Sequence, residues 1–167
     1  LGANDRVAIV LPNGAEMASV FVALASVVAS APLNPSYTDP EFEFYLSDLN
    51  AKAIILAEGS DTAARDVAKR LGIFIIELRS IAECAGRFEL DFGSMERRNN
   101  DAVSIGNDIA LVLHTSGTTS RPKIVPLSQA NLCASALNIQ SALNLTSKDR
   151  CLNVMPLFHI HGLIAAV

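Results

Sequence analysis

The sequence has little of several residue types, and each shortage excludes a class of protein. It has no tryptophan, only 18% of its residues are charged, and no long basic run accompanies the formal net charge of −4. Because proteins that hold a nucleic-acid backbone need a basic stripe, we expect no nucleic-acid partner. Apolar residues make up 50% of the chain, which is typical of a folded α/β protein with much buried surface.

The cysteines are too few and too widely spaced for a disulfide framework or a zinc site. Cys84, Cys133 and Cys151 form no CxxC pair. Cys133 lies in an apolar helical pattern, where a buried thiol is expected. Free thiols indicate a reducing intracellular compartment, and we expect the cytoplasm. A peroxisomal location stays open, because such a signal would stand at a C-terminus beyond Val167.

One uncharged run, Met17–Ala31, resembles a membrane helix. It is shorter than the roughly 18 residues that a bilayer requires, contains three serines and stops at Pro32. We therefore expect no membrane span and interpret the run as a helix buried against a sheet. A membrane-associated protein anchored by this run is the weaker alternative.

Apolar runs alternate along the chain with segments of helical pattern. The runs expected to be strands are Arg6–Leu11, Ala53–Ala57, Ile73–Leu78, Ile109–Leu113 and Cys151–Met155. The expected helices are Ala15–Ser30, Pro40–Leu49, Asp61–Leu71 and Gln129–Leu143. Asp39 and Ser128 are the expected caps of two helices, and Gly72 is the expected stop of a third. Segment 79–107 reads as a surface connection, with room for a short helix.

This alternation predicts an α/β fold, a parallel sheet with a mixed edge and helices on both faces. Sheets of this kind bind ligands outside the carboxyl ends of their strands. Both ends of the chain look cut, since Leu1 leads directly into a strand and Leu163–Val167 is an apolar run without a cap. We therefore expect residues 1–167 to be a fragment of a larger domain.

A loop rich in hydroxyl groups follows the strand that ends at Leu113. Its phosphate-binding candidates are Thr115, Ser116, Gly117, Thr118, Thr119, Ser120 and Lys123. Hydroxyl groups donate to phosphate oxygens, glycine lets backbone N–H groups turn toward an anion, and lysine supplies a point charge. It is not a Walker A loop, because no glycine precedes Lys123. The alternative is a Ser/Thr-rich surface loop without a special role.

The second motif is Met155-Pro156-Leu157-Phe158-His159-Ile160-His161-Gly162-Leu163. A zinc site is not expected here, because no Cys, Asp or Glu lies nearby to complete one. Either histidine could instead be a polar core residue with a satisfied ring, and this alternative is stronger for His161 than for His159.

Together the two motifs resemble the adenylate-forming superfamily of acyl-CoA synthetases, peptide-synthetase adenylation domains and luciferases. Its signature is Ser/Thr-Gly-Thr-Thr-Gly-x-Pro-Lys-Gly, from which Ser120 and Ile124 depart. A β-branched residue at position 124 cannot take positive φ cheaply, so the geometry after Lys123 is expected to change. The motifs look most like those of oxalate–CoA ligases and their peroxisomal acyl-CoA synthetase-like relatives. The resemblance covers nearly the whole chain.

The resemblance implies ATP-dependent activation of a carboxylic acid to an acyl adenylate, followed by thioester formation with coenzyme A. ATP, Mg²⁺ and coenzyme A are the implied cofactors and co-substrates, and a small carboxylic acid is the implied partner. His159 is the implied catalytic residue, with Phe158, His161 and Gly162 as candidates for the substrate pocket. The family's adenine, ribose and hinge motifs have no counterpart before Val167, so we expect the fragment alone to be inactive. A non-catalytic nucleotide- or phosphate-binding α/β module is the alternative.

Overall fold

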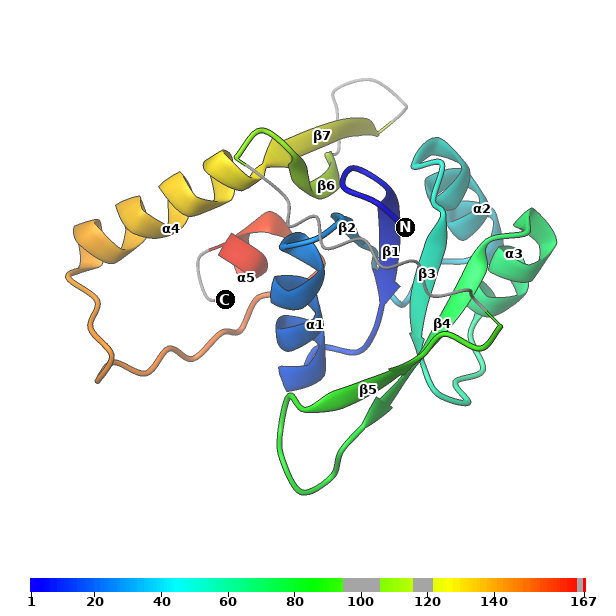
Figure 1. Cartoon of the computed structure of the whole chain (residues 1–167), viewed down its shortest axis with the longest axis horizontal. Helices are drawn as coiled ribbons and strands as arrows, with labels where there is room; N and C mark the ends of the chain where they lie inside the picture. Colours follow the sequence, from blue (N-terminus) through cyan, green and yellow to red (C-terminus); the bar gives the residue numbers. More distant parts are fainter. Residues whose placement is uncertain (95–105, 116–121, 165–166) are drawn as a thin grey trace.

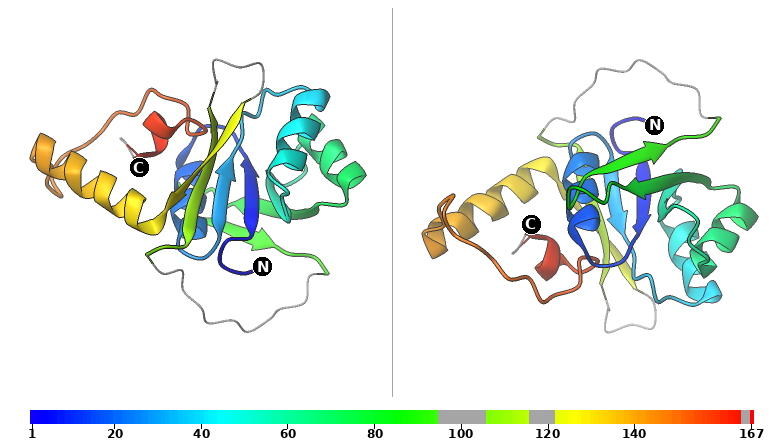
Figure 2. Two further views of the ribbon diagram at one scale, coloured as in Figure 1. Left: turned by 90° about the horizontal axis from the view of Figure 1, so that it is seen from above. Right: turned by 90° about the horizontal axis from the view of Figure 1, so that it is seen from below.

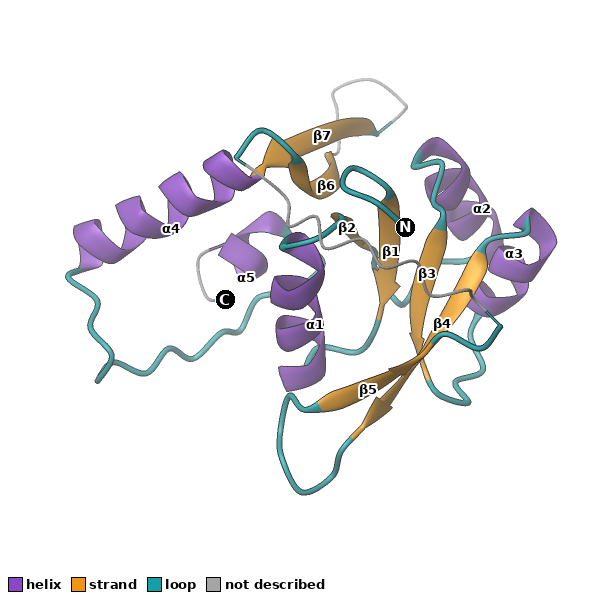
Figure 3. Cartoon of the chain, in the orientation of Figure 1, coloured by secondary structure: helices purple, strands orange, loops and turns teal. Residues whose placement is uncertain are grey.

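The computed structural model describes residues 1–94, 106–115, 122–164 and 167. Its described strands form one seven-stranded sheet with helices on both faces (Figure 1, Figure 3). The strands are β1 Arg6–Val10, β2 Ala29–Pro32, β3 Ala53–Ala57, β4 Phe74–Ser80, β5 Phe88–Asp91, β6 Ile109–Thr115 and β7 Lys123–Ser128. The helices are α1 Ala15–Ala25, α2 Asp39–Asp48, α3 Ala63–Leu71, α4 Gln129–Leu143 and α5 Ile160–Ile164.

The sheet is parallel in the middle and antiparallel at both edges, which confirms the predicted fold class. Its strand order is β5-β4-β3-β1-β2-β6-β7. The inner five strands pair in parallel, whereas β5 and β7 run antiparallel to β4 and β6. Because the inner strands are parallel, their carboxyl ends lie at one edge of the sheet.

Successive residues of the central strand β1 pack against different layers. Val7 and Ile9 belong to a buried cluster shared with α1 and α5. Ala8 and Val10 belong to a second cluster, shared with α2 and α3. Figure 2 shows these helix pairs on opposite faces of the sheet. The alternation is what a strand buried on both faces requires.

Local chemistry explains where the helices begin and end. Thr38, not Asp39, is the N-cap of α2, because the carboxylate of Glu41 accepts a hydrogen bond from the Thr38 N–H at 2.8 Å. The expected cap Ser128 is confirmed, since its hydroxyl accepts from the Asn131 N–H at 3.2 Å. Gly72 ends α3 with φ 68°, a conformation that favours glycine.

Three strands were absent from the sequence-based expectation. The predicted helix Ala15–Ser30 ends at Ala25, and its last residues turn into β2. Inside β2, the buried Ser30 hydroxyl donates to the Ala110 carbonyl at 2.7 Å and so ties β2 to β6. The two edge strands β5 and β7 lie in segments that were expected to be a surface connection and a loop.

The predicted strand Cys151–Met155 is wrong. These residues form no regular structure, and Figure 3 draws the segment between α4 and α5 as loop. Leu152 is 86% exposed. In the described sheet β6 is paired on both sides, with β2 and β7, and Cys151–Met155 adds no strand to it.

The expected burial of Cys133 is also wrong. All three cysteines are exposed, and α4 has no buried residue. This helix extends away from the sheet in Figure 1, so its apolar side chains have little to pack against in the described part of the chain. Within that same part, no helix combines the length and the apolarity that a bilayer crossing demands.

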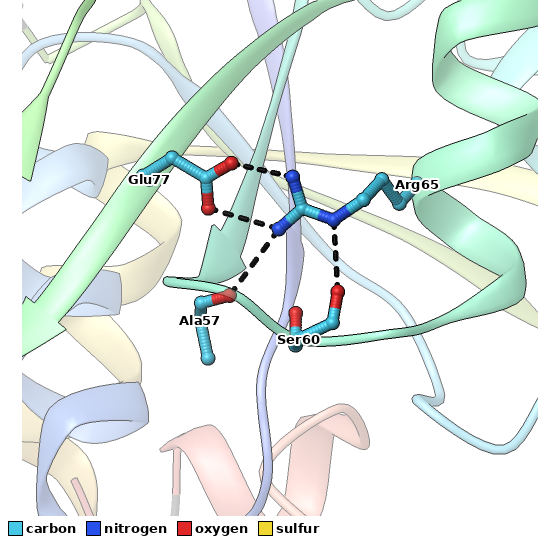
Figure 4. Close-up of polar contacts among 4 residues, drawn as sticks. All are labelled: Ala57, Ser60, Arg65 and Glu77. Carbon is cyan, nitrogen blue, oxygen red and sulfur yellow. Dashed lines mark hydrogen bonds and ion pairs between the residues drawn. The ribbon is translucent and has the colours of Figure 1, made fainter.

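Arg65 fastens α3 to the strands beside it (Figure 4). Its guanidinium donates to both carboxylate oxygens of Glu77 on β4, with Nη2–Oε2 at 2.9 Å. The same side chain donates to the carbonyl of Ser60 at 2.8 Å and to that of Ala57. A bidentate pair of this kind fixes both partners in one geometry.

Candidate functional site

The candidate site begins where β6 and β7 approach each other at the carboxyl edge of the sheet. His114 pairs with Ile124, and Thr115 pairs with Lys123, so the two strands hold both ends of the predicted phosphate-binding loop. Thr115 and Lys123 are exposed at these ends. The predicted residues Ser116, Gly117, Thr118, Thr119 and Ser120 lie outside the described residues.

Ile124 does not strain the backbone. It lies inside β7, where an extended conformation suits a β-branched side chain. Its side chain is half-buried and packs against the α2–α3 cluster. The expected cost of a positive φ therefore does not arise, and the chain continues from Lys123 as a regular strand.

A cavity of about 400 Å³ joins the strand ends to the second motif. Its lining comes from the segments around α2, from the β6–β7 hairpin and from the start of α5. The lining residues are Tyr37, Tyr45, Leu113, His114, Thr115, Pro122, Val125, Phe158, His159 and Ile160. Residues more than 120 positions apart in the sequence thus face one space, of the size that holds a small ligand.

Part of the cavity wall is aromatic and was not foreseen from the sequence. The rings of Tyr37 and Tyr45 stack at 4.6 Å, and His114 meets Tyr45 edge-on at 4.7 Å. Burial, followed by the hydrogen bond with Tyr45, raises the pKa of Tyr37 well above its usual value, so that phenol stays neutral. Tyr37 and Tyr45 are the only tyrosines in the sequence, which could have drawn attention to them. Their place at the cavity follows only from the contact between α2 and β6.

His114 is held from behind by α2. Its side chain is 6% exposed, and its Nε2 lies 3.0 Å from Asp48 Oδ2. Because a carboxylate only accepts hydrogen bonds, Nε2 carries the proton in this pair. Asp48 also borders a larger hollow of about 610 Å³ on the outer face of α2, which contains none of the predicted site residues.

The second motif contributes Phe158 and His159 to the cavity. Their rings lie 4.7 Å apart, and the His159 N–H donates to the Pro156 carbonyl at 3.1 Å in the turn before α5. His159 is exposed, so its ring can reach a ligand. His161, on α5, is also exposed but does not belong to the lining, and neither does Gly162.

Gly162 allows α5 to approach the chain that precedes it. A Cβ atom at this position would lie 2.9 Å from the Pro156 carbonyl carbon and 3.0 Å from the Met155 oxygen, and nearer still to the Pro156 oxygen. Only a residue without a side chain fits there. Gly162 therefore sets the position of the turn that carries Phe158 and His159.

The described residues of the site include a cation, Lys123, that can attract an anion. None of the described residues that line the cavity carries a carboxylate. Lys123, which follows the lining residue Pro122 in the sequence, supplies an ammonium group nearby. Among the described residues there is no cluster of three or more His, Cys, Asp or Glu side chains that could hold a metal ion.

The chain is a doubly covered α/β sheet with a cavity at its carboxyl edge, the place where folds of this class bind ligands. The model of the AMP-binding enzyme family matches residues 1–167. The chain belongs to this AMP-binding family.

Curated relatives at about 40% identity are ligases. Oxalate–CoA ligase of Arabidopsis thaliana is 40% identical over 168 residues, which cover 98% of this chain and 32% of that protein. Oxalate–CoA ligase of Saccharomyces cerevisiae is 40% identical over 189 residues, covering 98% of this chain and 35% of that protein. The chain thus spans about a third of the length of these relatives.

Solved structures share the fold. o-Succinylbenzoate CoA synthetase of Bacillus subtilis, in complex with its acyl-adenylate intermediate, matches with a TM-score of 0.73 and 26% identity. The match covers 99% of this chain and 32% of that one. ATP-bound MatB of Rhodopseudomonas palustris matches with a TM-score of 0.75 at 24% identity over 99% of this chain and 33% of that one, which supports the fold alone.

Proposed function

We propose that residues 1–167 form a part of the N-terminal AMP-binding domain of a longer, AMP-forming acid–CoA ligase. The observation that carries this proposal is the shared cavity, where the ends of the hydroxyl-rich loop meet the Phe158–His159 motif. The family match over the whole chain and the ligase relatives support it. The rest of the nucleotide site and the small C-terminal domain would lie in the remaining two thirds.

The proposed reaction has two halves. In the first, a carboxylate oxygen of the acid attacks the α-phosphorus of ATP, and pyrophosphate leaves as the acyl adenylate forms. In the second, the thiol of coenzyme A attacks the acyl carbon, loses its proton, and displaces AMP to give the thioester. ATP would bring Mg²⁺ to the site, where the ion neutralises phosphate charge.

The residues of this chain serve the first half in different ways. The hydroxyl groups of Thr115, Ser116, Thr118, Thr119 and Ser120 would donate to the phosphates of ATP, with Gly117 allowing the backbone to approach. Lys123 would stabilise the charge that develops on the departing pyrophosphate. His159 would stand at the acyl side of the cavity, with Phe158 as an apolar wall. His161 and Gly162 would support this wall from α5.

We infer a small acid as the substrate, with oxalate as the first candidate. The support is the similarity of about 40% identity to two oxalate–CoA ligases. Direct identification requires ATP–pyrophosphate exchange by the full-length protein with a panel of carboxylic acids. Exchange with none of them would leave the non-catalytic nucleotide-binding module as the better account.

Substitution of Lys123 by Ala tests the role of the loop. We expect ATP–pyrophosphate exchange to fall about 100-fold, because one preorganised charge on the leaving group is lost. Lys148→Ala is the matched control, since Lys148 is also exposed but lies in the turn after α4. Unchanged exchange in the Lys123 variant would remove this lysine from the reaction.

The isolated 167-residue chain should not catalyse the reaction. The proposed adenine, ribose and C-terminal contributions are absent from it, so we expect no acyl adenylate above the uncatalysed background. The measurement is release of radioactive pyrophosphate from ATP in the presence of oxalate. Turnover by this chain at a rate near that of the full-length protein would contradict the expectation.

A further inference from the structure

We propose that Asp48 and His114 form a positioning pair that sets the ends of β6 and β7 for the adenylation half of the reaction, in which pyrophosphate leaves. The proposal rests on the proposed function for its ligand, ATP. Asp48 belongs to neither sequence motif, and His114, which directly precedes the hydroxyl-rich loop, was not among the predicted site residues. The two are joined only in the folded chain, 66 positions apart.

The first support is the way His114 is buried. Its side chain keeps 6% exposure, and a polar ring in such a place needs a hydrogen-bond partner. Asp48 is that partner, at 3.0 Å from Nε2. Packing alone does not require an imidazole, because a phenylalanine ring could make the same edge-on contact with Tyr45. The hydrogen bond to Asp48 fixes the rotation of the His114 ring, which packing alone does not do.

The second support is the position of His114 in the sheet. It is the residue at which β6 leaves the buried core, after Leu113 and before the exposed Thr115. It pairs with Ile124, and the next pair is Thr115 with Lys123. A shift of His114 would therefore move both strand ends, including the lysine proposed to face the leaving phosphates.

The third support is the rigidity of the partner element. Asp48 is the last residue of α2, and the buried residues Phe42 and Leu46 of that helix anchor it to the sheet. Tyr45, one turn before Asp48, also contacts His114. Helix α2 thus holds the His114 ring in two ways, through the edge-on contact with Tyr45 and through the hydrogen bond from Nε2 to Asp48. A site held in this way keeps the close tolerances that phosphoryl chemistry needs.

The test uses the full-length protein and separates its two half-reactions. His114→Phe keeps the ring but loses the hydrogen bond, and Asp48→Ala loses the acceptor. We expect each to lower kcat/KM for ATP in pyrophosphate exchange about tenfold, the effect of one hydrogen bond in this range. Thioester formation from a preformed acyl adenylate and coenzyme A should stay within about twofold, because no pyrophosphate leaves in that step.

Two further variants guard against a general structural effect. Asp48→Asn should keep most of the activity that Asp48→Ala loses, because the amide oxygen of asparagine can still accept a hydrogen bond from Nε2–H of His114. Ser47→Ala, at the exposed neighbouring position on α2, should behave as the wild type. Equal losses in both half-reactions, or wild-type exchange in His114→Phe and Asp48→Ala, would overturn the proposal.

Hydrogen exchange distinguishes failure of this proposal from failure of the proposed function. In His114→Phe and Asp48→Ala, amides of 109–115 and 122–128 should exchange faster, whether or not the protein is a ligase. If the wild type shows no pyrophosphate exchange, the proposed function fails, and the amide measurement still decides whether the pair sets the strand ends. Unaltered amide exchange in both variants would overturn the positioning role.

Discussion

Among individual residues, the partly buried ion pair of Arg65 and Glu77 makes the stability of the protein depend on pH. The side chains are 18% and 27% exposed, so water screens them less than the surface pairs of this chain. The hydrogen bond from Arg65, with burial opposing it, lowers the pKa of Glu77 below its usual range. A depressed folded-state pKa stabilises the protein above the unfolded-state pKa, and that stabilisation is lost as the pH falls through the folded value.

Glu77→Gln should therefore destabilise the protein at neutral pH by about 1–2 kcal/mol, the value of a charge-assisted hydrogen bond. The difference from the wild type should begin to shrink as the pH falls below about 4.3, the usual pKa of glutamate, because the unfolded state then binds a proton. It should vanish only below the lower folded-state pKa, where Glu77 is protonated in both states. Urea unfolding of both proteins between pH 3 and pH 7 provides the measurement.

Glu58→Gln is the control for this prediction. Glu58 pairs with Arg79 at 3.2 Å, but both side chains are at least half exposed. Exposed pairs contribute little, so its effect should stay below about 1 kcal/mol. A pH-independent loss of stability in Glu77→Gln would show that packing, and not charge, makes the Arg65 contact important.

At the scale of elements, α5 depends on one close approach. Gly162 lies against the backbone of Met155 and Pro156, and its neighbour Leu163 is buried in the α1 cluster. A methyl group at Gly162 would push the helix away from that backbone and draw Leu163 from its site. The Phe158–His159 turn, which precedes α5 directly, would move with it.

We expect Gly162→Ala to lower the free energy of unfolding by about 1–3 kcal/mol, the usual cost of overpacking. Alanine is the better helix former, so a net loss would show that the clash outweighs propensity. Gly106→Ala, in a turn, is the control for a glycine-to-alanine change without a clash, because nothing lies within 4 Å of its added Cβ. Chemical denaturation of both variants provides the measurement, and equal stabilities would contradict the close-approach account.

Two of the three unpredicted strands, β5 and β7, lie at the edges of the sheet and lack the pattern of a buried strand. β7 contains Pro126 and begins with an exposed lysine, so it lacks the continuous apolar pattern of an inner strand. β5 alternates half-buried and exposed residues over only four positions. Cys151–Met155 has a strand-like composition, yet it forms no strand, and Leu152 is 86% exposed. Composition reports local preference, whereas strand formation depends on packing against neighbouring parts of the chain.

For the whole molecule, sequence patterns were sufficient for the fold class and for the two-sided burial of the inner strands. They also predicted Thr115, Phe158 and His159 as site residues, and the structure brings these three to one cavity. They could not identify Tyr37, Tyr45 or the Asp48–His114 pair as part of this site. Those contacts depend on how α2 lies against β6, which no local pattern encodes.

The buried clusters on the two faces of the sheet take their residues from different parts of the chain, and this affects the order in which they can form during synthesis. The buried cluster beneath α2 and α3 takes its members from Ala8 to Val112. The cluster beneath α1 also contains Leu157 and Leu163. Domains form as the ribosome delivers them from the N-terminus. The cluster beneath α2 and α3 can therefore be buried while the last third of residues 1–167 is still inside or near the ribosome. The cluster beneath α1 keeps apolar surface exposed to water until α5 has emerged.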